Sequence, residues 1–450
     1  MEANSADHIA RHLSAHVDDA LTGFRVVVLH GARQSGKTTL AQHTAQRAGG
    51  TYLTLEDPQI LQSALDDPVA LLEGWPLPLA VDEIQVAGDR LVKAVKRLVD
   101  ADQTPGRYLL TGSSNFLTVP TISESLAGRA RLLRLAPLSQ AECTRTDTPP
   151  LDAWMEQTGA ARALSQRSAT SPLTRRDYAH LICTGGYPEV LRLPDRLRAG
   201  WFESYIETVV ERDIAALADI RRSAALLPLL RWTAAHTAQE LIVAEASRRL
   251  GISQPTVVAY LEWLRTVFFV HELPAWSRNL SARAVRRPKL HVADTGLAAH
   301  LLGVDPDALA VPTSRALGPL TESFVVVEIA RQASSSANRL SLWHYRDARH
   351  EVDLILERPD GSIVAVEVKA SGSPSPRAAD HLRWLRDRLD AAAPGTFAAG
   401  VLLHMGEHEL SLGDRLSMRP ISSLWTAGLP HDDDRVRANP AASNGAEPPE

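Results

Sequence analysis

Residues 31–38 read GARQSGKT, and their types and spacing fit a loop that binds phosphate groups. The two glycines let successive backbone N–H groups curl around phosphate oxygens at the start of a helix. Lys37 would reach the outer phosphates, and the Thr38 hydroxyl is a ligand for Mg²⁺. The apolar run FRVVVL precedes the motif and the helix-compatible TLAQHTAQRA follows it, which is the context that the motif requires. We therefore predict an ATP and Mg²⁺ site that contains Gly31, Ala32, Arg33, Gln34, Ser35, Gly36, Lys37, Thr38 and Thr39.

Hydrolysis of a bound nucleotide also needs carboxylates, and LPLAVDEIQ at 77–85 supplies two at the end of an apolar strand. Asp82 would help to hold Mg²⁺, and Glu83 would orient and deprotonate the attacking water. A further strand, RYLLTGSSN at 107–115, ends in polar residues. Ser113 and Asn115 are candidates for sensing the γ-phosphate, and the alternative is an ordinary polar loop between a strand and a helix.

A cationic side chain is the remaining requirement, because charge develops on the transferred phosphoryl group. The segment ESLAGRARLLRL at 124–135 offers Arg129 and Arg131. We predict Arg129 as the stabilising residue, either in its own chain or in a neighbouring copy of a homo-oligomer. Arginine is abundant in this sequence, so an ordinary surface role is the alternative.

A second group of chemically capable residues lies in the hairpin EVDLILERPDGSIVAVEVKA at 351–370. Alternation puts Val352, Leu354 and Leu356 on one face of the first strand. A three-residue loop at 359–361, with Gly361 in the left-handed conformation, sets a register in which Asp353 opposes Glu367. Opposed carboxylates repel unless a cation or a proton lies between them.

A divalent metal is the natural partner for such a pair, because carboxylate oxygens are the ligands that Mg²⁺ prefers. Asp353 and Glu367 would hold the metal, and Lys369 would help to generate the attacking hydroxide. Glu322, in the predicted helix at 317–332, is the third acidic candidate, with Glu328 as a weaker substitute. The alternative is a salt bridge between Lys369 and Asp353 that neutralises the pair without a metal.

The elements around these residues form several domains, since 450 residues at roughly 150 per domain predict about three. Short apolar runs alternate with amphipathic stretches from residue 24 to about 137, which predicts a doubly wound, mainly parallel α/β sheet. We predict boundaries as follows: a P-loop domain at 1–142, a loop-rich linker and helical region at 143–223, a winged-helix-like module at 224–276, a strand-rich C-terminal domain at 277–427 and a disordered tail at 428–450.

The middle module raises the question of DNA. In VAEASRRLGISQPTVVAYLEWLRTVFFV, Gly251 can make the turn, Ser253 can cap the next helix, and Pro255 fits its first turn. That helix lacks the Arg, Lys and Asn content of a base-reading helix, which favours packing between domains. The following SRNLSARAVRRPKL at 277–290 carries Arg278, Arg283, Arg286, Arg287 and Lys289, so contact with DNA phosphates and a solvated loop both remain open.

Composition excludes other classes of protein. Apolar content of 44%, charged content of 22% and a net charge of −5 give no global basic field for nucleic acid or anionic membrane. The N-terminus lacks a signal pattern and the apolar runs are too short to span a bilayer, so we expect a cytoplasmic protein without a membrane partner. Cys143 and Cys183 make no disulfide framework. Only five of the 48 basic residues are lysine, so a retained lysine marks a place where a compact charge is needed.

The chain resembles a family of bacterial and archaeal proteins that join an AAA-type P-loop ATPase domain to a C-terminal domain of unassigned function with a restriction-endonuclease-like, PD-(D/E)XK core. The resemblance covers about residues 20–405 and rests on GARQSGKTTL, AVDEIQ, LLTGSSNF, SLAGRARLLRLAPLSQAE, GGYPEVL, YIETVVERDI, RRPKLHVADTGL and the hairpin, in the family's order. It implies an ATP-binding protein with a nuclease-like domain. Arg349 and His350 stand where the family usually has a small residue, and their bulk and charge would occlude or replace a metal.

The sequence therefore predicts an ATPase coupled to a nuclease-like domain that acts on DNA. The alternative is an ATP-dependent switch whose nuclease-like domain only binds nucleic acid or a protein partner.

Overall fold

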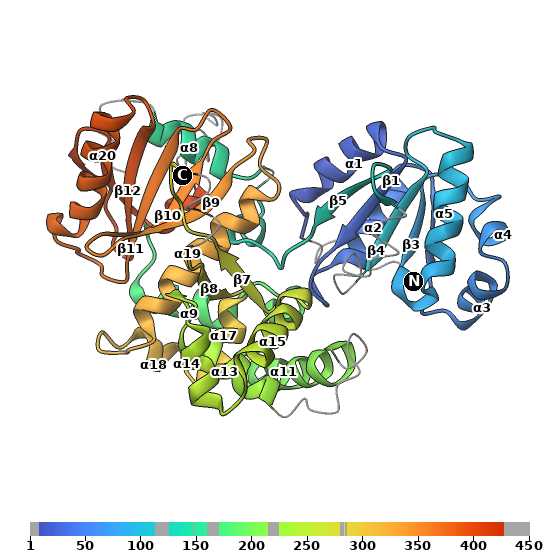
Figure 1. Cartoon of the computed structure of the whole chain (residues 1–450), viewed down its shortest axis with the longest axis horizontal. Coiled ribbons are helices and arrows are strands. Elements are labelled where there is room, and N and C mark those ends of the chain that lie inside the picture. Colours follow the sequence, from blue (N-terminus) through green and yellow to red (C-terminus); the bar gives the residue numbers. More distant parts are fainter. Residues whose placement is uncertain are drawn as a thin grey trace, which may run out of the picture.

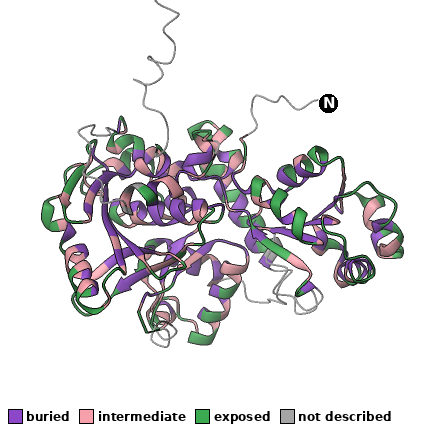
Figure 2. Ribbon diagram, turned by 90° about the horizontal axis from the view of Figure 1, so that it is seen from above, coloured by how far each residue is buried: buried purple, intermediate pink, exposed green. Residues whose placement is uncertain are grey.

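The computed structural model describes residues 9–112, 126–146, 148–159, 171–214, 225–279, 283 and 286–426. Figure 1 shows an N-terminal α/β domain in blue to teal, a helical middle part in green and yellow, and a C-terminal α/β domain in orange and red. The two α/β domains lie on opposite sides of this view. Figure 2 shows that buried residues follow the strands and the inner helices of both domains. The predicted α/β class is confirmed.

The N-terminal domain is built on a parallel sheet with the strand order β2–β3–β4–β1–β5. Strand β1 lies between β4 and β5, and its side chains alternate between two cores: Val26 and Val28 face one, whereas Val27 and Leu29 face the other. Because all five strands run the same way, their carboxyl ends meet at one edge, where the loops that bind ligands lie. The strands are β1 (Val26–His30), β2 (Thr51–Thr54), β3 (Leu79–Asp82), β4 (Tyr108–Gly112) and β5 (Ala130–Arg134).

Helices cover both faces of this sheet, as the alternating pattern predicted. On one face α1 (Leu13–Gly23) and α2 (Lys37–Arg47) bury apolar side chains against β1. The other face is covered by α3 (Pro58–Asp66), α4 (Pro68–Leu72) and α5 (Asp89–Ala101), and the 3-10 turn η2 (Ile84–Ala87) follows β3.

The middle part is mainly helical. A first group of helices follows the N-terminal domain: α7 (Gln140–Cys143), α8 (Leu151–Gly159), α9 (Arg175–Thr184), α10 (Pro188–Arg192), α11 (Asp195–Thr208) and the π-helical η4 (Val209–Ile214). A second group contains a small sheet with the order β6–β8–β7: α13 (Leu226–Ala235), β6 (Gln239–Glu240), α14 (Val243–Leu250), α15 (Gln254–Thr266), β7 (Val270–Leu273), β8 (Lys289–Val292), α17 (Thr295–Leu302) and α18 (Pro306–Ala310).

The turn between α14 and α15 forms as predicted. Gly251 ends α14 with φ +66°, and the Ser253 side chain accepts a hydrogen bond from the Thr256 N–H at the start of α15. Pro255 lies in the first turn of α15. Glycine tolerates the left-handed conformation at a helix end, and serine satisfies an N–H that has no partner within the helix.

Two segments make contacts across the predicted domain boundaries. Strand β8 pairs with β7 and β6, so the boundary at 276–277 falls between two paired strands of one sheet. Helix α8, inside the predicted loop-rich linker and helical region, buries Trp154 in a core shared with the C-terminal sheet. This core also contains Ala32 of the phosphate loop, Leu226 of the middle part and Leu354 of the C-terminal domain. The middle and C-terminal parts therefore share one packed interior that Ala32 joins. The strands of the N-terminal sheet pack in two separate cores.

The C-terminal domain is built on a mixed sheet with the order β13–β14–β12–β11–β10–β9. Helix α19 covers one face and α20 covers the other, which leaves the central strands β11 and β12 buried on both sides. The elements are α19 (Leu317–Ala333), β9 (Ser341–Arg346), β10 (Glu351–Glu357), β11 (Ile363–Lys369), the 3-10 turn η6 (Pro376–Ala379), α20 (Asp380–Ala392), β12 (Phe397–His404), β13 (Leu410–Gly413), β14 (Leu416–Pro420) and α21 (Ser423–Thr426).

The β10–β11 hairpin has the predicted register, since Leu354 pairs with Val366. Gly361 has φ +82° in the connecting loop, also as predicted. The prediction that Val352 shares a face with Leu354 is wrong: Val352 packs with Ile355 in the core under α20, whereas Leu354 packs in the core under α19. A register shift between Val352 and Ile355 in the pairing with β9 causes this, because one extra residue changes the alternation of side chains.

The described helices include none with the length and apolar content needed to cross a membrane. Cys143 and Cys183 are both free and half-buried. The predicted tail at 428–450 lies outside the described residues.

Candidate functional site

The phosphate loop connects β1 to α2, and its backbone needs glycine at both motif positions. A Cβ atom on Gly31 would lie 2.0 Å from the Leu135 carbonyl oxygen, and Gly36 has φ +94° where it precedes α2. The Lys37 side chain is buried, and its Nζ donates hydrogen bonds to the carbonyl oxygens of Gly31 at 3.0 Å and Ala32 at 2.8 Å. The ammonium group is therefore held inside the loop that would surround the phosphates.

Asp82, at the end of β3, meets the start of α2 from the other side. The Thr38 Oγ1 donates a hydrogen bond of 2.7 Å to Asp82 Oδ2. A hydroxyl and a carboxylate in contact offer the hard oxygen ligands that Mg²⁺ prefers, so the residues present fit this ion. The structure thus brings together Lys37, Thr38 and Asp82, which the sequence motifs predicted.

Two further hydroxyl groups hold Asp82, and the sequence gave no signal for either. The Tyr52 hydroxyl on β2 donates to Asp82 Oδ2 at 2.8 Å, and the Thr111 hydroxyl on β4 donates to Oδ1. Burial and the hydrogen bond to Asp82 raise the pKa of Tyr52 well above its ordinary value, so this phenol remains a donor. Both side chains come from the strands on either side of β3. They are distant from Asp82 in the sequence, so the spacing of residues along the chain does not predict these contacts.

Glu83 follows Asp82 in a left-handed conformation with φ +55°, which turns the chain sharply after β3. Its backbone N–H donates to Asp82 Oδ1 at 3.1 Å, and its carboxylate accepts a hydrogen bond from the Gln85 side chain. Such a backbone conformation is uncommon in residues other than glycine and is often found at functional sites. The turn positions the predicted base at the wall of the nucleotide cavity.

This cavity has a volume of about 500 Å³. Predicted residues that line it are Arg33, Gln34, Gly36, Lys37, Thr38, Thr39 and Glu83. Residues that no sequence motif indicated also line it from other elements, among them Arg11 from the N-terminal segment, Arg145, and Pro188, Glu189 and Arg192 of α10. Ser113 and Asn115 lie outside the described residues, so their predicted role stays a prediction.

Arg129 lies apart from the residues that line the cavity. It is half-buried and forms an ion pair with Asp100 at the end of α5, with an Nε–Oδ1 distance of 2.6 Å. Within this chain it therefore contacts a surface carboxylate, and its predicted role in a neighbouring copy stays a prediction.

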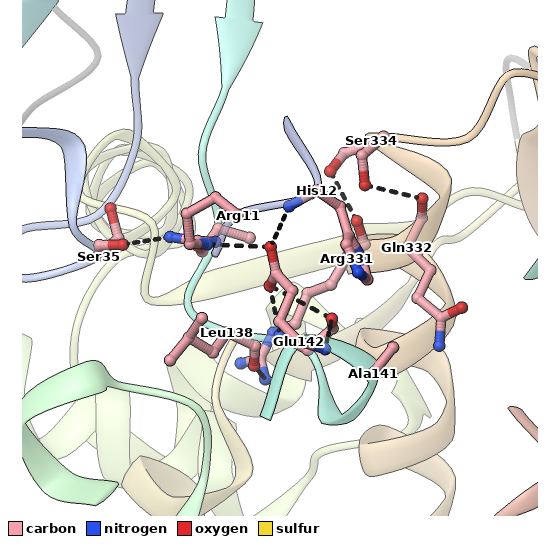
Figure 3. Close-up of polar contacts among 12 residues, drawn as sticks. Arg11, His12, Ser35, Leu138, Ala141, Glu142, Arg331, Gln332 and Ser334 are labelled. Carbon is pink, nitrogen blue, oxygen red and sulfur yellow. Dashed lines mark hydrogen bonds and ion pairs between the residues drawn. The ribbon is translucent and has the colours of Figure 1, made fainter. Parts of the chain in front are cut away.

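The phosphate loop is also tied to the chain beyond the N-terminal domain. Arg11 donates to the Ser35 carbonyl oxygen at 2.6 Å and to Glu142 Oε1 at 3.0 Å, and the His12 N–H donates to the same Glu142 oxygen at 2.9 Å (Figure 3). The Tyr205 hydroxyl of α11 donates to the Arg33 carbonyl oxygen at 3.1 Å. Movement of the phosphate loop would therefore change its contacts with side chains of the middle part.

Asp294 connects the segment before α10 to helix α19 of the C-terminal domain. Its carboxylate is buried and accepts hydrogen bonds from the Gly186 N–H at 2.7 Å and from Arg331 of α19 at 2.9 Å. Gly186 precedes α10, which lines the nucleotide cavity, and a Cβ on Gly185 would lie 2.1 Å from Asp294 Oδ1. The GGYPEVL and ADTGL segments, more than a hundred residues apart, thus form one contact.

The predicted C-terminal site is buried between β10, β11 and α19. Asp353 is 7% exposed and Glu367 is 4% exposed, so these carboxylates are not surface charge. Asp353 Oδ2 accepts the Val368 N–H at 2.9 Å, and Lys369 Nζ donates to Glu367 Oε1 at 2.6 Å. The predicted alternative of a Lys369–Asp353 bridge is thus replaced by a Lys369–Glu367 pair.

A residue that the sequence analysis placed elsewhere completes this site. Lys289, expected in a basic strip that contacts phosphates, is buried, and its Nζ lies 2.7 Å from Glu322 Oε1, 2.7 Å from Glu351 Oε1 and 3.4 Å from Asp353 Oδ1. Within the described part of the chain, no set of three or more Asp, Glu, His or Cys side chains is arranged to hold a metal ion. This arrangement differs from the predicted metal site of Glu322, Asp353 and Glu367.

Arg349 and His350 do not fill that position. The His350 ring stacks on Trp384 with a centroid distance of 3.8 Å, and the Arg349 N–H donates to Asp347. Contrary to the prediction, neither residue therefore occludes or replaces a metal at the acidic site, because the His350 ring lies against α20 and Arg349 is exposed. Glu328, the weaker substitute for Glu322, accepts the Gln140 N–H at 2.8 Å on another part of α19.

The remaining cations of the basic strip differ in exposure. Arg283 forms two hydrogen bonds with Glu357 at 2.7 and 2.8 Å, so its charge is already paired. Arg278, Arg286 and Arg287 are exposed. On α15, Val257, Tyr260, Leu261 and Leu264 are buried in the shared core, which agrees with the predicted packing role.

Comparison with known proteins assigns these parts. Residues 23–144 match an AAA domain, residues 175–308 match a domain of unknown function (DUF8612), and residues 317–424 match another domain of unknown function (DUF4143). Uncharacterized proteins of Mycobacterium tuberculosis and Mycobacterium bovis are each 31% identical over 421 residues, covering 93% of this chain and 85% of the relative. The chain belongs to the family of these mycobacterial proteins.

More distant matches are an uncharacterized protein of Haemophilus influenzae, and a solved structure, AMPPCP-bound DnaA from Aquifex aeolicus. The first is 23% identical over 300 residues, covering 62% of this chain and 69% of the relative. The second has a TM-score of 0.29 and 11% identity, covering 59% of this chain and 89% of DnaA, and this similarity is too low to support an inference. In the present chain, the P-loop, Asp82 and Glu83 all lie within the residues that match the AAA domain.

Proposed function

We propose that this protein is an ATP-dependent switch, in which Mg²⁺-dependent binding and hydrolysis of ATP by the AAA domain change the contacts of the middle and C-terminal parts. The observation that carries the proposal is the 2.7 Å hydrogen bond between Thr38 and Asp82 at the start of α2. It joins the two predicted Mg²⁺ ligands beside the buried Lys37, in a cavity large enough for a nucleotide.

The residues of the cavity divide the work. Lys37 and the backbone N–H groups of the loop bind the phosphates, and the start of α2 adds the favourable end of a helix dipole. Mg²⁺, held by Thr38 and Asp82, would neutralise charge on the phosphates. Glu83 accepts a proton from the attacking water, and Gln85 orients the Glu83 carboxylate for this role.

ATP hydrolysis with Mg²⁺ by the purified full chain tests the proposal. Glu83→Gln should bind ATP and lose hydrolysis, because an amide cannot accept the proton of the water. Exposed Glu73 on the same domain provides a matched control, and Glu73→Gln should hydrolyse normally. Undiminished hydrolysis by Glu83→Gln would overturn the assignment of the base.

The folds proposed for the middle and C-terminal parts rest on the order of their helices and strands. The middle part has the element order helix–strand–helix–helix–strand–strand from α13 to β8, which supports a winged-helix module. The C-terminal sheet carries Asp353 and the Glu367-x-Lys369 pair on adjacent strands, with Glu322 on a covering helix, which supports a restriction-endonuclease-like fold. DNA, or a protein partner, would bind these parts. Contacts through Asp294 and α10 would make this binding depend on the nucleotide.

Nucleic-acid cleavage is a second candidate function, suggested by Asp353 and the Glu367–Lys369 pair on adjacent strands, and it would require a metal ion in place of the Lys289 ammonium. Incubation with single- and double-stranded DNA and RNA in Mn²⁺, with and without ATP, tests it directly. Cutting by the wild type and none by the Glu367→Ala, Lys369→Ala double variant would establish a nuclease. Equal cutting by both would indicate a contaminant.

A further inference from the structure

Lys289 sits where the acidic side chains of the C-terminal site converge, although it belongs to a different sheet. It lies on β8 of the small middle sheet, whereas its partners come from α19 and β10. Its side chain is 1% exposed, and its Nζ is within 3.4 Å of Glu322, Glu351 and Asp353. A lysine ammonium has three N–H donors, and here it has three carboxylate partners.

The distances fit an ammonium group and not a metal ion. Oxygen ligands lie about 2.0–2.1 Å from Mg²⁺ and about 2.3–2.6 Å from Ca²⁺, whereas hydrogen bonds from charged nitrogen to oxygen are about 2.7–2.9 Å. Two of the three contacts of Lys289 are 2.7 Å. The ammonium therefore occupies the space that a cation bound to Glu322 and Asp353 would need.

The acidic charge around Lys289 is partly offset without a metal. Four acidic side chains, Glu322, Glu351, Asp353 and Glu367, face the ammonium groups of Lys289 and Lys369. The two ammonium groups therefore supply positive charge of the kind that a bound metal would otherwise provide.

The use of lysine in this sequence supports the same interpretation. Lysine supplies five of the 48 basic residues, so arginine is the default cation. A guanidinium holds its donors in one rigid plane, whereas an ammonium is a compact point charge whose three donors can turn toward three carboxylates. Lys289 is one of the few positions where the chain keeps this group.

We propose that Lys289 is the built-in cation of the C-terminal acidic site: it takes the place of a divalent metal and fastens β8 of the middle module to α19 and β10. The wild-type site then holds no metal and performs no metal-dependent cleavage. This inference is independent of ATP hydrolysis, because it concerns only the C-terminal acidic site.

Mn²⁺ binding to the nucleotide-free full chain, measured by the loss of the free-ion electron paramagnetic resonance signal, tests the proposal. Wild type and Asp353→Asn should bind Mn²⁺ equally, since neither has an open acidic site. Lys289→Met should gain a Mn²⁺ site with an affinity at least an order of magnitude above that of the wild type. The matched variant Lys369→Met, which keeps Lys289, should gain none.

A wild-type Mn²⁺ site that Asp353→Asn removes would overturn the proposal, as would a Lys289→Met variant that folds and gains no site. Lys289→Met leaves buried carboxylates without their cation, which is costly for folding. Should this variant fail to fold, the comparison of wild type with Asp353→Asn still decides between a lysine and a metal. Because no nucleotide is present, either outcome leaves the ATPase assay as a separate test.

Discussion

The Tyr52 hydroxyl lies 2.8 Å from Asp82 Oδ2, the same oxygen that accepts the Thr38 hydroxyl at 2.7 Å. One carboxylate oxygen thus links the strand β2, the strand β3 and the start of α2. Tyr52 is therefore expected to act as a positioning residue, because it fixes the direction in which Asp82 presents its lone pairs to the ion.

Tyr52→Phe should lower kcat for ATP hydrolysis by roughly tenfold with little change in KM, since a hydrogen bond to a charged group contributes about 1.5–3 kcal/mol. Steady-state kinetics over a range of Mg²⁺ concentrations measure this, and the variant should need more Mg²⁺ for half-maximal rate. Tyr345→Phe is the matched control, because its hydroxyl donates to Asp347 at the same 2.8 Å distance far from the nucleotide cavity. An unchanged Mg²⁺ requirement in Tyr52→Phe would contradict the role.

The ion pair between Arg11 and Glu142 gives a second prediction, which concerns how the phosphate loop is held in place. Arg11→Met should lower the free energy of unfolding by about 3–5 kcal/mol, because buried Glu142 loses its cation. ATP affinity should fall as well, since Arg11 also donates to the Ser35 carbonyl oxygen. Denaturant unfolding and nucleotide titration measure the two effects.

A double-mutant cycle separates the ion pair from the rest of Arg11. Glu142→Gln keeps a side chain able to complete the capping box at the start of α7. The double variant should cost clearly less than the sum of the single variants. Additive costs would mean that the pair contributes nothing beyond its separate contacts.

Asp294→Asn should be strongly destabilising, by about 3–5 kcal/mol, because it removes the charge that pairs with Arg331 in a closed interior. Its nucleotide-induced stabilisation should also shrink, since Asp294 holds the segment before α10 through Gly186. Thermal unfolding with and without ATP measures both. Asp305→Asn is the control: this exposed residue caps α18, and Asn caps a helix about as well as Asp. Equal effects of the two substitutions would argue against the connection.

These residues show which parts of the structure the sequence predicted. The loop at 31–38, the strand that ends in Asp82 and the turn at Gly361 follow from local patterns, because glycine and alternating apolar residues restrict the backbone within a few positions. The register that opposes Asp353 and Glu367 follows from the length of that turn. Short-range chemistry was therefore sufficient for the main motifs.

Contacts between elements were not predictable in the same way. Tyr52 reaches Asp82 because β2 lies beside β3, and Lys289 reaches the hairpin because two sheets pack together. One bulge in the pairing with β9 was enough to move Val352 to the other face. The rarity of lysine was the one signal that singled out Lys289, and its position in a run of arginines pointed to phosphate contacts instead.

Glu367 gives a prediction about pH. Its pKa rises from 4.5 to about 8, first because the carboxyl is buried and second because Asp353 is close, while Lys369 and Lys289 oppose the rise. Between these two values the unfolded chain has released the proton and the native chain still holds it. Stability must therefore fall as pH rises through this window, by up to about 1.4 kcal/mol for each unit of the shift.

Glu367→Gln should flatten this fall, because the amide has no proton to release. We expect the wild type to lose more free energy of unfolding than Glu367→Gln between about pH 5 and pH 8, with the variant relatively more stable at the upper end. Urea unfolding at both pH values measures the difference. The exposed Glu407→Gln control should follow the wild type, since its carboxyl is already solvated. A wild type and a Glu367→Gln variant with equal losses would show that the Glu367 carboxyl is ionised throughout, held by Lys369.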